Sequence, residues 1–196
     1  MFELVKKLLY FGMIKIDRGS YRIFGERAVL FWADEFAAVS RRTIEDETFR
    51  KEIYKTMRDG FRASVEKLDS KMKLDRDGLI KLMGDFAEMN GYGEMVGIGG
   101  EFDNHHMYYR IKGLPTTVLK GKVKGYADVY ITGMGAGAGE YIFNDPTIEC
   151  VEVKCELMGD PYCEFIMAPK ERLKKEYPEF YKSQVWDPEG NPGRGN

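Results

Sequence analysis

All three cysteines of this 196-residue chain lie close together, between positions 150 and 163. A cysteine sulfur can bind a metal, act as a nucleophile or form a disulfide, and the compartment helps to decide which. The N-terminal stretch carries Lys6, Lys7 and Lys15 without a small-residue cleavage site after it, so we predict no signal peptide and a cytoplasmic protein. A disulfide framework is then disfavoured, and the crowding of the cysteines favours metal binding.

Cys155 and Cys163 flank a predicted turn at Gly159 and Asp160. A β-hairpin bent at this turn brings the two sulfurs together from opposing strands. Tetrahedral zinc takes thiolate sulfurs at about 2.3 Å and carboxylate oxygens at about 2.0–2.2 Å. Glu152 lies three residues before Cys155 and can supply such an oxygen. These two cysteines and the glutamate are therefore candidate zinc ligands.

Strand geometry sets a condition on this cluster. Side chains alternate along a strand, so a regular strand sends Glu152 and Cys155 to opposite faces. Joint coordination requires a β-bulge between the two residues, or the end of the strand. Cys150 has the same parity as Glu152 and is a candidate for a further thiolate ligand, although a small buried side chain is the alternative.

Two other groups of residues invite a functional interpretation. The run from Gly133 to Gly139 is glycine-rich, but neither Gly133 nor Gly135 has a glycine five positions later, so the dinucleotide fingerprint is missing. Close packing of a helix on a sheet, or a pocket lining, explains these glycines better. His105 and His106 are the only histidines. Adjacent residues on a strand point apart, so at most one of them could join a given metal site, and we expect both in a solvated loop.

The N-terminal half contains the patterns of a hairpin and several helices. A short helix is expected over residues 2–11, then a hairpin around residues 17–19. After Gly25 the spacing predicts an amphipathic helix, or a strand passing into one. Apolar residues then recur every three or four positions from Glu45 to about Leu74, and again over residues 77–89, where Asn90 and Gly91 suit a helix end.

The C-terminal half is richer in strand signals. Short β-branched and aromatic stretches follow Gly91, with Pro115 as a break. Residues 125–139 form a closely packed helix or a loop, and residues 147–157 and 162–169 form two antiparallel strands joined by a tight turn at 158–161. The tail after Trp186 has almost no apolar residues and should be disordered. This order of elements favours an α+β fold.

Composition limits the partners. Hydrophobic residues make up 43% of the chain, enough for a sizeable core. Thirty basic and thirty-two acidic residues leave a formal charge of −2, so no uniform field attracts nucleic acid or an anionic membrane. Nowhere do about eighteen uncharged apolar residues run together, as a spanning helix requires. We therefore predict no nucleic-acid partner and no membrane partner.

The cysteine segment resembles the signature of the 4-vinyl reductase domain. That signature has a glutamate, a cysteine three residues later, a Gly-Asp turn, and a cysteine followed by an aromatic residue. The matching positions are Glu152, Cys155, Gly159, Asp160, Cys163 and Phe165. The likeness covers residues 50–168, and the first fifty residues resemble the lead-in found in stand-alone archaeal members.

This resemblance implies an antiparallel sheet with helices, related to haem-type nitric oxide-binding domains and to TRAPP subunits, with a ligand pocket beneath a curved sheet. In members that regulate aromatic catabolism, the glutamate and cysteines bind zinc and an upstream cysteine completes the site. This chain has no cysteine upstream of Cys150. The resemblance thus implies a structural zinc on Glu152, Cys155 and Cys163, with Cys150 or Asp128 as the fourth ligand.

Three functions follow from the resemblance, and one of them, a TRAPP-like assembly subunit, predicts a stable dimer with no pocket. The leading hypothesis is a zinc-containing, homodimeric domain that binds a small hydrophobic or aromatic ligand and acts as a sensor or carrier, not as a catalyst. The alternative is a reductase or tetrapyrrole-processing enzyme, against which the missing nucleotide fingerprint argues, since a reductase needs an electron source.

The chain has enough aromatic side chains to line an apolar pocket. Core packing explains each of them singly, so none is assigned to a pocket. They are Trp32, Phe36, Phe86, Tyr108, Tyr109, Tyr126, Tyr130 and Tyr141. By region, we expect an N-terminal helix and hairpin lead-in over residues 1–45, a 4-vinyl reductase-like domain over 46–170, and a C-terminal helix with a disordered tail over 171–196.

Overall fold

A computed structural model describes residues 10, 12–23, 25–29 and 32–187. The helix expected over residues 2–11 falls almost wholly outside these residues, and so does the tail over residues 188–196. Within the described part, two antiparallel sheets and six α-helices make an α+β fold, as the sequence predicts.

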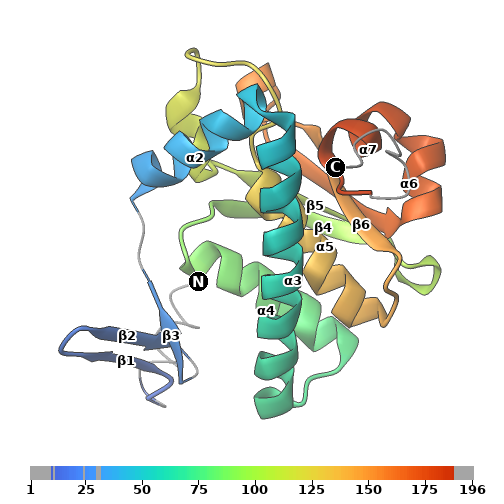
Figure 1. The fold of residues 1–196 in the computed structure, drawn as a ribbon. Helices are drawn as coiled ribbons and strands as arrows, with labels where there is room; N and C mark the ends of the chain where they lie inside the picture. The colour runs from blue at the N-terminus through green and yellow to red at the C-terminus, as the bar shows by residue number, and fades with distance from the viewer. Residues whose placement is uncertain (1–9, 11, 24, 30–31, 188–196) are drawn as a thin grey trace, which may run out of the picture.

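The first sheet is small and lies beside the rest of the molecule (Figure 1). Its strands pair in the order β1-β2-β3 and have the bounds β1 (Ile14–Asp17), β2 (Ser20–Ile23) and β3 (Glu26–Ala28). Asp17 pairs with Ser20, which leaves a two-residue turn that ends at Gly19 with φ +73°. A positive φ suits glycine in such hairpin turns, and the predicted hairpin is confirmed.

Three helices follow this sheet. Their bounds are α2 (Ala33–Glu45), α3 (Glu47–Met72) and α4 (Arg76–Met89). The carboxylate of Asp46 accepts the backbone N–H of Phe49 at 3.0 Å, and that of Asp75 accepts the N–H of Gly78 at 2.8 Å, so each acid caps the helix that follows it. The segment after Gly25 therefore contains a strand, β3, and then a helix, α2.

The second sheet holds the remaining strands in the order β4-β5-β7-β6, all antiparallel. The bounds are β4 (Glu94–Glu101), β5 (His106–Lys112), β6 (Ile148–Lys154) and β7 (Cys163–Pro169). Three short 3₁₀ turns connect elements: η1 (Phe102–Asn104), η2 (Pro115–Leu119) and η3 (Glu156–Met158). The remaining helices are α5 (Val129–Phe143), α6 (Lys170–Glu176) and α7 (Pro178–Gln184).

Helix α5 lies between α3 and the second sheet (Figure 1). On one face, a Cβ atom added at Gly133 would come within 2.6 Å of the carbonyl oxygen of Tyr54 in α3. On the opposite face, a Cβ at Gly135 would overlap the hydroxyl of Tyr109 in β5. Glycines spaced along both faces therefore let one helix touch a helix backbone and a sheet at once. Of the two alternatives for residues 125–139, the packed helix is present.

The core lies on the α5 side of the second sheet. Phe165 and Tyr109 stack with ring centroids 4.9 Å apart, and both are buried. Among the described residues, no helix combines enough length with enough apolar character to span a bilayer. The division of the chain at residues 45 and 170 stays a prediction.

Candidate functional site

Four buried side chains meet at one end of α5. They are Asp128, Glu152, Cys155 and Cys163, and their ligand atoms all lie within 4.8 Å of one another. Asp128 immediately precedes α5, Glu152 lies on β6, Cys155 follows the end of β6, and Cys163 begins β7. Two carboxylates and two thiols packed this tightly can hold a metal ion.

The condition that strand geometry imposes on this cluster is met. The pairing of β6 with β7 shifts register between Glu152 and Lys154, and β6 ends at Lys154. The irregularity at Val153 turns Cys155 back to the face of Glu152. The connection to β7 is longer than the tight turn predicted at residues 158–161, because η3 precedes Gly159, which has φ +101°.

The distances suit a single small cation. The Cys163 sulfur lies 3.4 Å from Oδ2 of Asp128, and the Cys155 sulfur lies 3.8 Å from the same oxygen. In a tetrahedral zinc site, bonds of about 2.3 Å to sulfur and 2.0 Å to oxygen place those two atoms about 3.5 Å apart. The thiols and the aspartate therefore already stand close to the corners of such a tetrahedron.

Neighbouring groups hold the candidate ligands in place. Thr116, buried in η2, donates its hydroxyl to Oδ1 of Asp128 at 2.5 Å, which leaves Oδ2 facing the sulfurs. The backbone N–H of Glu156 donates to the Cys163 sulfur at 3.3 Å, and the N–H of Cys155 donates to Asp160 at 2.9 Å. Such outer partners orient metal ligands and tune their affinity. Thr116 could not be recognised from the sequence, because it lies apart from the cysteine motif.

Gln184 of α7 fixes the strand that carries Glu152. Its side-chain oxygen accepts the backbone N–H of Glu152 at 2.8 Å, and its amide nitrogen donates to the Glu152 carbonyl at 2.9 Å. The glutamine thus pairs with this outer strand edge as a neighbouring strand would.

The two carboxylates and two thiolates of this buried cluster would be four negative charges together, so they must be neutralised by protons or by a cation. Burial and the nearby Asp128 charge raise the pKa of Glu152 well above its usual value, and burial raises the pKa of Asp128. A hydrogen bond with Cys155 and burial raise the pKa of Cys163, while the same bond lowers that of Cys155. Among the described residues, Oε1 of Glu152 is buried without a hydrogen-bond partner. A divalent cation replaces such protons and satisfies that oxygen, so the residues fit a metal.

Cys150, which the sequence offered as a further ligand, does not belong to this four-residue cluster. Its sulfur lies 3.6 Å from the hydroxyl of Tyr109, beside Gly135 in the middle of α5. Cys150 faces the same side as Glu152, but two residues along a strand span about 6.6 Å. Asp128, the other candidate for the fourth position, is the residue that the fold brings to the sulfurs.

The histidines also lie away from the cluster. His105 has φ +51°, its ring stacks on Phe143, and its Nδ1 lies 2.8 Å from the Asp145 carboxylate. His106 begins β5. Neither histidine belongs to the four-residue cluster.

A cavity of about 80 Å³ lies between α4, α5 and the second sheet, and we call it the inner pocket. Its lining is almost wholly apolar and includes Phe61, Met83, Met95, Met107, Tyr109 and Met134. The Tyr109 hydroxyl donates to the backbone carbonyl of Ile131 at 3.1 Å, so this hydroxyl already has a hydrogen-bond partner within the protein. This cavity suits an apolar or aromatic molecule.

Most of the aromatic residues noted in the sequence lie outside the lining of the inner pocket. Tyr109 lines the inner pocket, but Trp32 is 79% exposed and Tyr130 packs on Phe36 with centroids 4.3 Å apart. Methionines supply much of the lining instead. They were not recognised in the sequence because an apolar methionine at core spacing has the same pattern whether it borders a cavity or fills the core.

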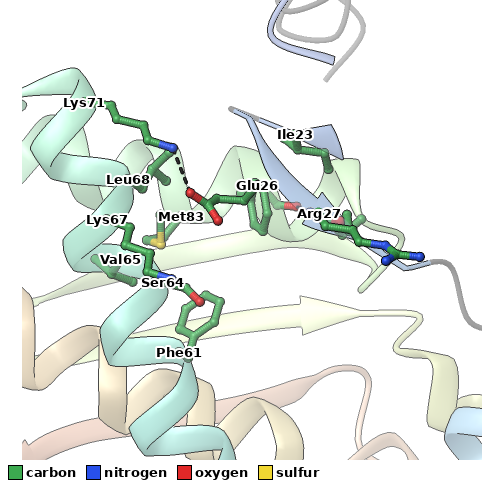
Figure 2. Close-up of a pocket in the computed structure, with 13 residues that line it drawn as sticks. Ile23, Glu26, Arg27, Phe61, Ser64, Val65, Lys67, Leu68, Lys71 and Met83 are labelled. Atoms are coloured by element: carbon green, nitrogen blue, oxygen red, sulfur yellow. Dashed lines mark hydrogen bonds and ion pairs between the residues drawn. The ribbon is translucent and has the colours of Figure 1, made fainter. Parts of the chain in front are cut away.

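A second, larger cavity of about 360 Å³ separates the first sheet from α3 and α4, and we call it the outer pocket (Figure 2). Its lining includes Ile23, Glu26, Phe61, Lys67, Lys71 and Met83. Lys71 of α3 reaches across the cavity to Glu26 of β3, with 2.9 Å between nitrogen and oxygen.

Comparison with known proteins supports the fold. The phenol-responsive sensory domain of the transcription activator PoxR, solved with phenol, superposes with a TM-score of 0.70 at 13% identity, covering 92% of this chain and 95% of that one. A trafficking protein particle complex subunit 3 from Naegleria fowleri, covalently bound to palmitic acid, gives 0.52 at 15% identity, covering 70% and 92%. No protein-family model and no curated sequence matches this chain. At such low identities the likeness shows a shared fold alone, the TRAPP-type fold that the sequence predicts.

Proposed function

We propose that this chain is a ligand-binding sensor or carrier domain of the 4-vinyl reductase type, which takes a small hydrophobic or aromatic molecule into the inner pocket. The observation that carries the proposal is this methionine-lined cavity beneath the second sheet. It is supported by the fold shared with a phenol-responsive sensory domain over 92% of the chain. Fold likeness alone does not fix a function, so the pocket chemistry carries the argument.

The pocket wall can adapt to its ligand. An engineered cavity of about 150 Å³ lined by apolar residues binds benzene, and the inner pocket measures about 80 Å³. Methionine has three rotatable bonds and a polarizable sulfur that contacts aromatic rings favourably. Rotation of Met83, Met95 or Met134 can therefore widen the cavity for a single aromatic ring without moving a helix.

We propose further that Asp128, Glu152, Cys155 and Cys163 bind zinc. A closed tetrahedral site with four protein ligands serves structure. Here it would tie the N-terminal end of α5 to both ends of the β6–β7 connection, at a distance from the inner pocket. The unfolded chain lacks the assembled site, so the bound ion contributes folding free energy.

The binding role is preferred over the alternative of a reductase or tetrapyrrole-processing enzyme. A flat macrocycle of four pyrrole rings is far larger than a cavity of about 80 Å³. Nothing in the described part of the chain favours a nucleotide or other electron source. The homodimer expected from the sequence stays a prediction, and light scattering in solution tests it by giving twice the chain mass of 22.6 kDa.

Methionine methyl groups provide a direct test of ligand binding. In protein labelled at the methionine methyls, titration with phenol should shift the NMR signals of Met95, Met107 and Met134, which line the inner pocket. The signal of Met158, which is 48% exposed and far from the pocket lining, is the internal control. Shifts at Met158 without shifts at the pocket methionines would contradict the proposal.

A matched pair of substitutions separates pocket binding from general effects. Gly84 lies on α4 in the pocket wall, and a Cβ there would be 3.9 Å from Met95. Gly84→Leu should fill the cavity and weaken phenol binding by about tenfold or more, the loss of about 1.4 kcal/mol. Gly60→Leu is the control, since a Cβ at Gly60 on α3 meets no atom within 4 Å. Equal phenol affinity in both variants argues against the inner pocket.

A further inference from the structure

The inner and outer pockets are neighbours that share two side chains. Phe61 of α3 and Met83 of α4 line both cavities. Neither side chain carries an N–H or O–H group that a hydrogen bond could fix in place. Methionine also adopts many rotamers at low cost. A rotation of Met83 would therefore move part of the wall that the two pockets share.

The two pockets differ in charge. The inner lining contains no Lys, Arg, Asp or Glu side chain. The outer lining contains Arg27, Lys67 and Lys71 against a single carboxylate, Glu26, above an apolar floor that includes Val65. Figure 2 shows Lys67 and Lys71 on the α3 wall, with Lys71 directed at Glu26 and Arg27 directed away from the lysines. The two lysines therefore define a cationic end to the outer pocket.

We propose that the outer pocket binds the carboxylate of an amphipathic ligand whose apolar chain passes between Phe61 and Met83 into the inner pocket. The proposal rests on the proposed function for its apolar end, because it uses the same inner pocket. A charged group inside that pocket would lose its hydration without compensation, so it must stay outside. Lys71 pairs with Glu26 at 2.9 Å, and Lys67 lies in the same lining, so the two lysines can hold two carboxylates, that of Glu26 and that of the ligand.

The charge dependence of binding is tested with two ten-carbon probes. Decanoate and decan-1-ol have the same chain, and calorimetry at low ionic strength should show decanoate binding about tenfold more tightly, because exposed lysines attract an anion most strongly there. The double variant Lys67→Gln, Lys71→Gln should remove this preference for decanoate over decanol. Lys55→Gln is the control, because Lys55 lies on the same helix, pairs with Asp59 and is outside both linings.

The path of the chain is tested by the methionine methyl signals. Decanoate should shift the signal of Met83, between the pockets, together with that of Met134, inside the inner pocket. A shift at Met83 without one at Met134 overturns the passage of the chain.

The outcomes separate this inference from the proposed function. Decanoate that binds no better than decanol, or that keeps its preference in the double lysine variant, overturns the outer carboxylate site while a phenol response at the inner pocket stands. Absence of any response to phenol, decanol and decanoate overturns both proposals.

Discussion

Oδ2 of Asp128 lies 3.4 Å from the sulfur of Cys163, although 35 residues separate the two in the sequence. The aspartate stands just before α5, and the cysteine begins β7. Close packing of α5 on the sheet brings the start of the helix to the end of the hairpin. An acid is thus placed beside the two thiols, and it completes a set of four ligands of the kind that zinc binds.

Asp128→Asn should abolish zinc binding. Asparagine preserves the size of the side chain and still accepts the hydroxyl of Thr116, which donates to Oδ1, but it removes the anionic ligand. Loss of an outer partner alone weakens metal sites by about 10–100-fold, so we expect loss of a ligand to cost at least about 100-fold. Elemental analysis of protein from metal-replete cells should find about one zinc per wild-type chain and far less in the variant.

Cys155→Ser and Cys163→Ser should each lose zinc and lower the melting temperature, because each removes a thiolate and leaves the other buried acids without a cation. Cys150→Ser is the matched control. Its sulfur contacts Tyr109 and lies outside the four-residue cluster, so it should keep its zinc. A variant series in which Cys150→Ser loses zinc and Asp128→Asn retains it would reverse the assignment of the fourth ligand.

Gly137→Ala should destabilise the protein by about 2 kcal/mol or more. A Cβ at this position would overlap the backbone carbonyl of Arg58 in α3, and backbone atoms cannot rotate away. Gly60→Ala is the control on α3, where a Cβ meets nothing within 4 Å, and it should stabilise the helix by about 0.5–1 kcal/mol. Urea unfolding of both variants measures the difference, and equal stabilities would show that α5 is free to shift from α3.

The sequence predicted the parts of the site that are local. Glu152, Cys155 and Cys163 could be grouped because a hairpin brings residues on either side of a turn together, and the need for a bulge followed from strand alternation. The fourth ligand could not be chosen this way. Cys150 and Asp128 were both open, and only the packing of α5 on β6 decides which side chain reaches the sulfurs.

Contacts between distant segments were the least predictable. Tyr54 donates to the carboxylate of Glu149 at 2.6 Å across 95 residues, and Arg58 pairs with the same carboxylate. In the sequence, Tyr54 and Arg58 fit the pattern of an amphipathic helix like their neighbours, and Glu149 is one charged residue in a predicted strand. Nothing local indicates that the fold brings all three together. The inner pocket could not be predicted either, because the sequence shows which positions are apolar but not where their side chains leave a cavity in the fold.

The buried carboxyl of Glu149 should make stability depend on pH. Burial raises its pKa from 4.5 to about 7, against the opposing charge of Arg58. Between pH 4.5 and about 7, the folded protein therefore binds a proton that the unfolded chain does not. The stabilisation from this proton is complete below pH 4.5 and is lost as the pH rises through about 7. Glu149→Gln keeps a neutral group beside Tyr54 and leaves Arg58 paired with Glu140 at 3.0 Å, so it should lack this loss. Urea unfolding at pH 5 and pH 8 should show the variant gaining stability relative to the wild type at the higher pH. Parallel behaviour of the two proteins would mean that Glu149 is already charged at pH 5, with Arg58 outweighing the cost of its burial.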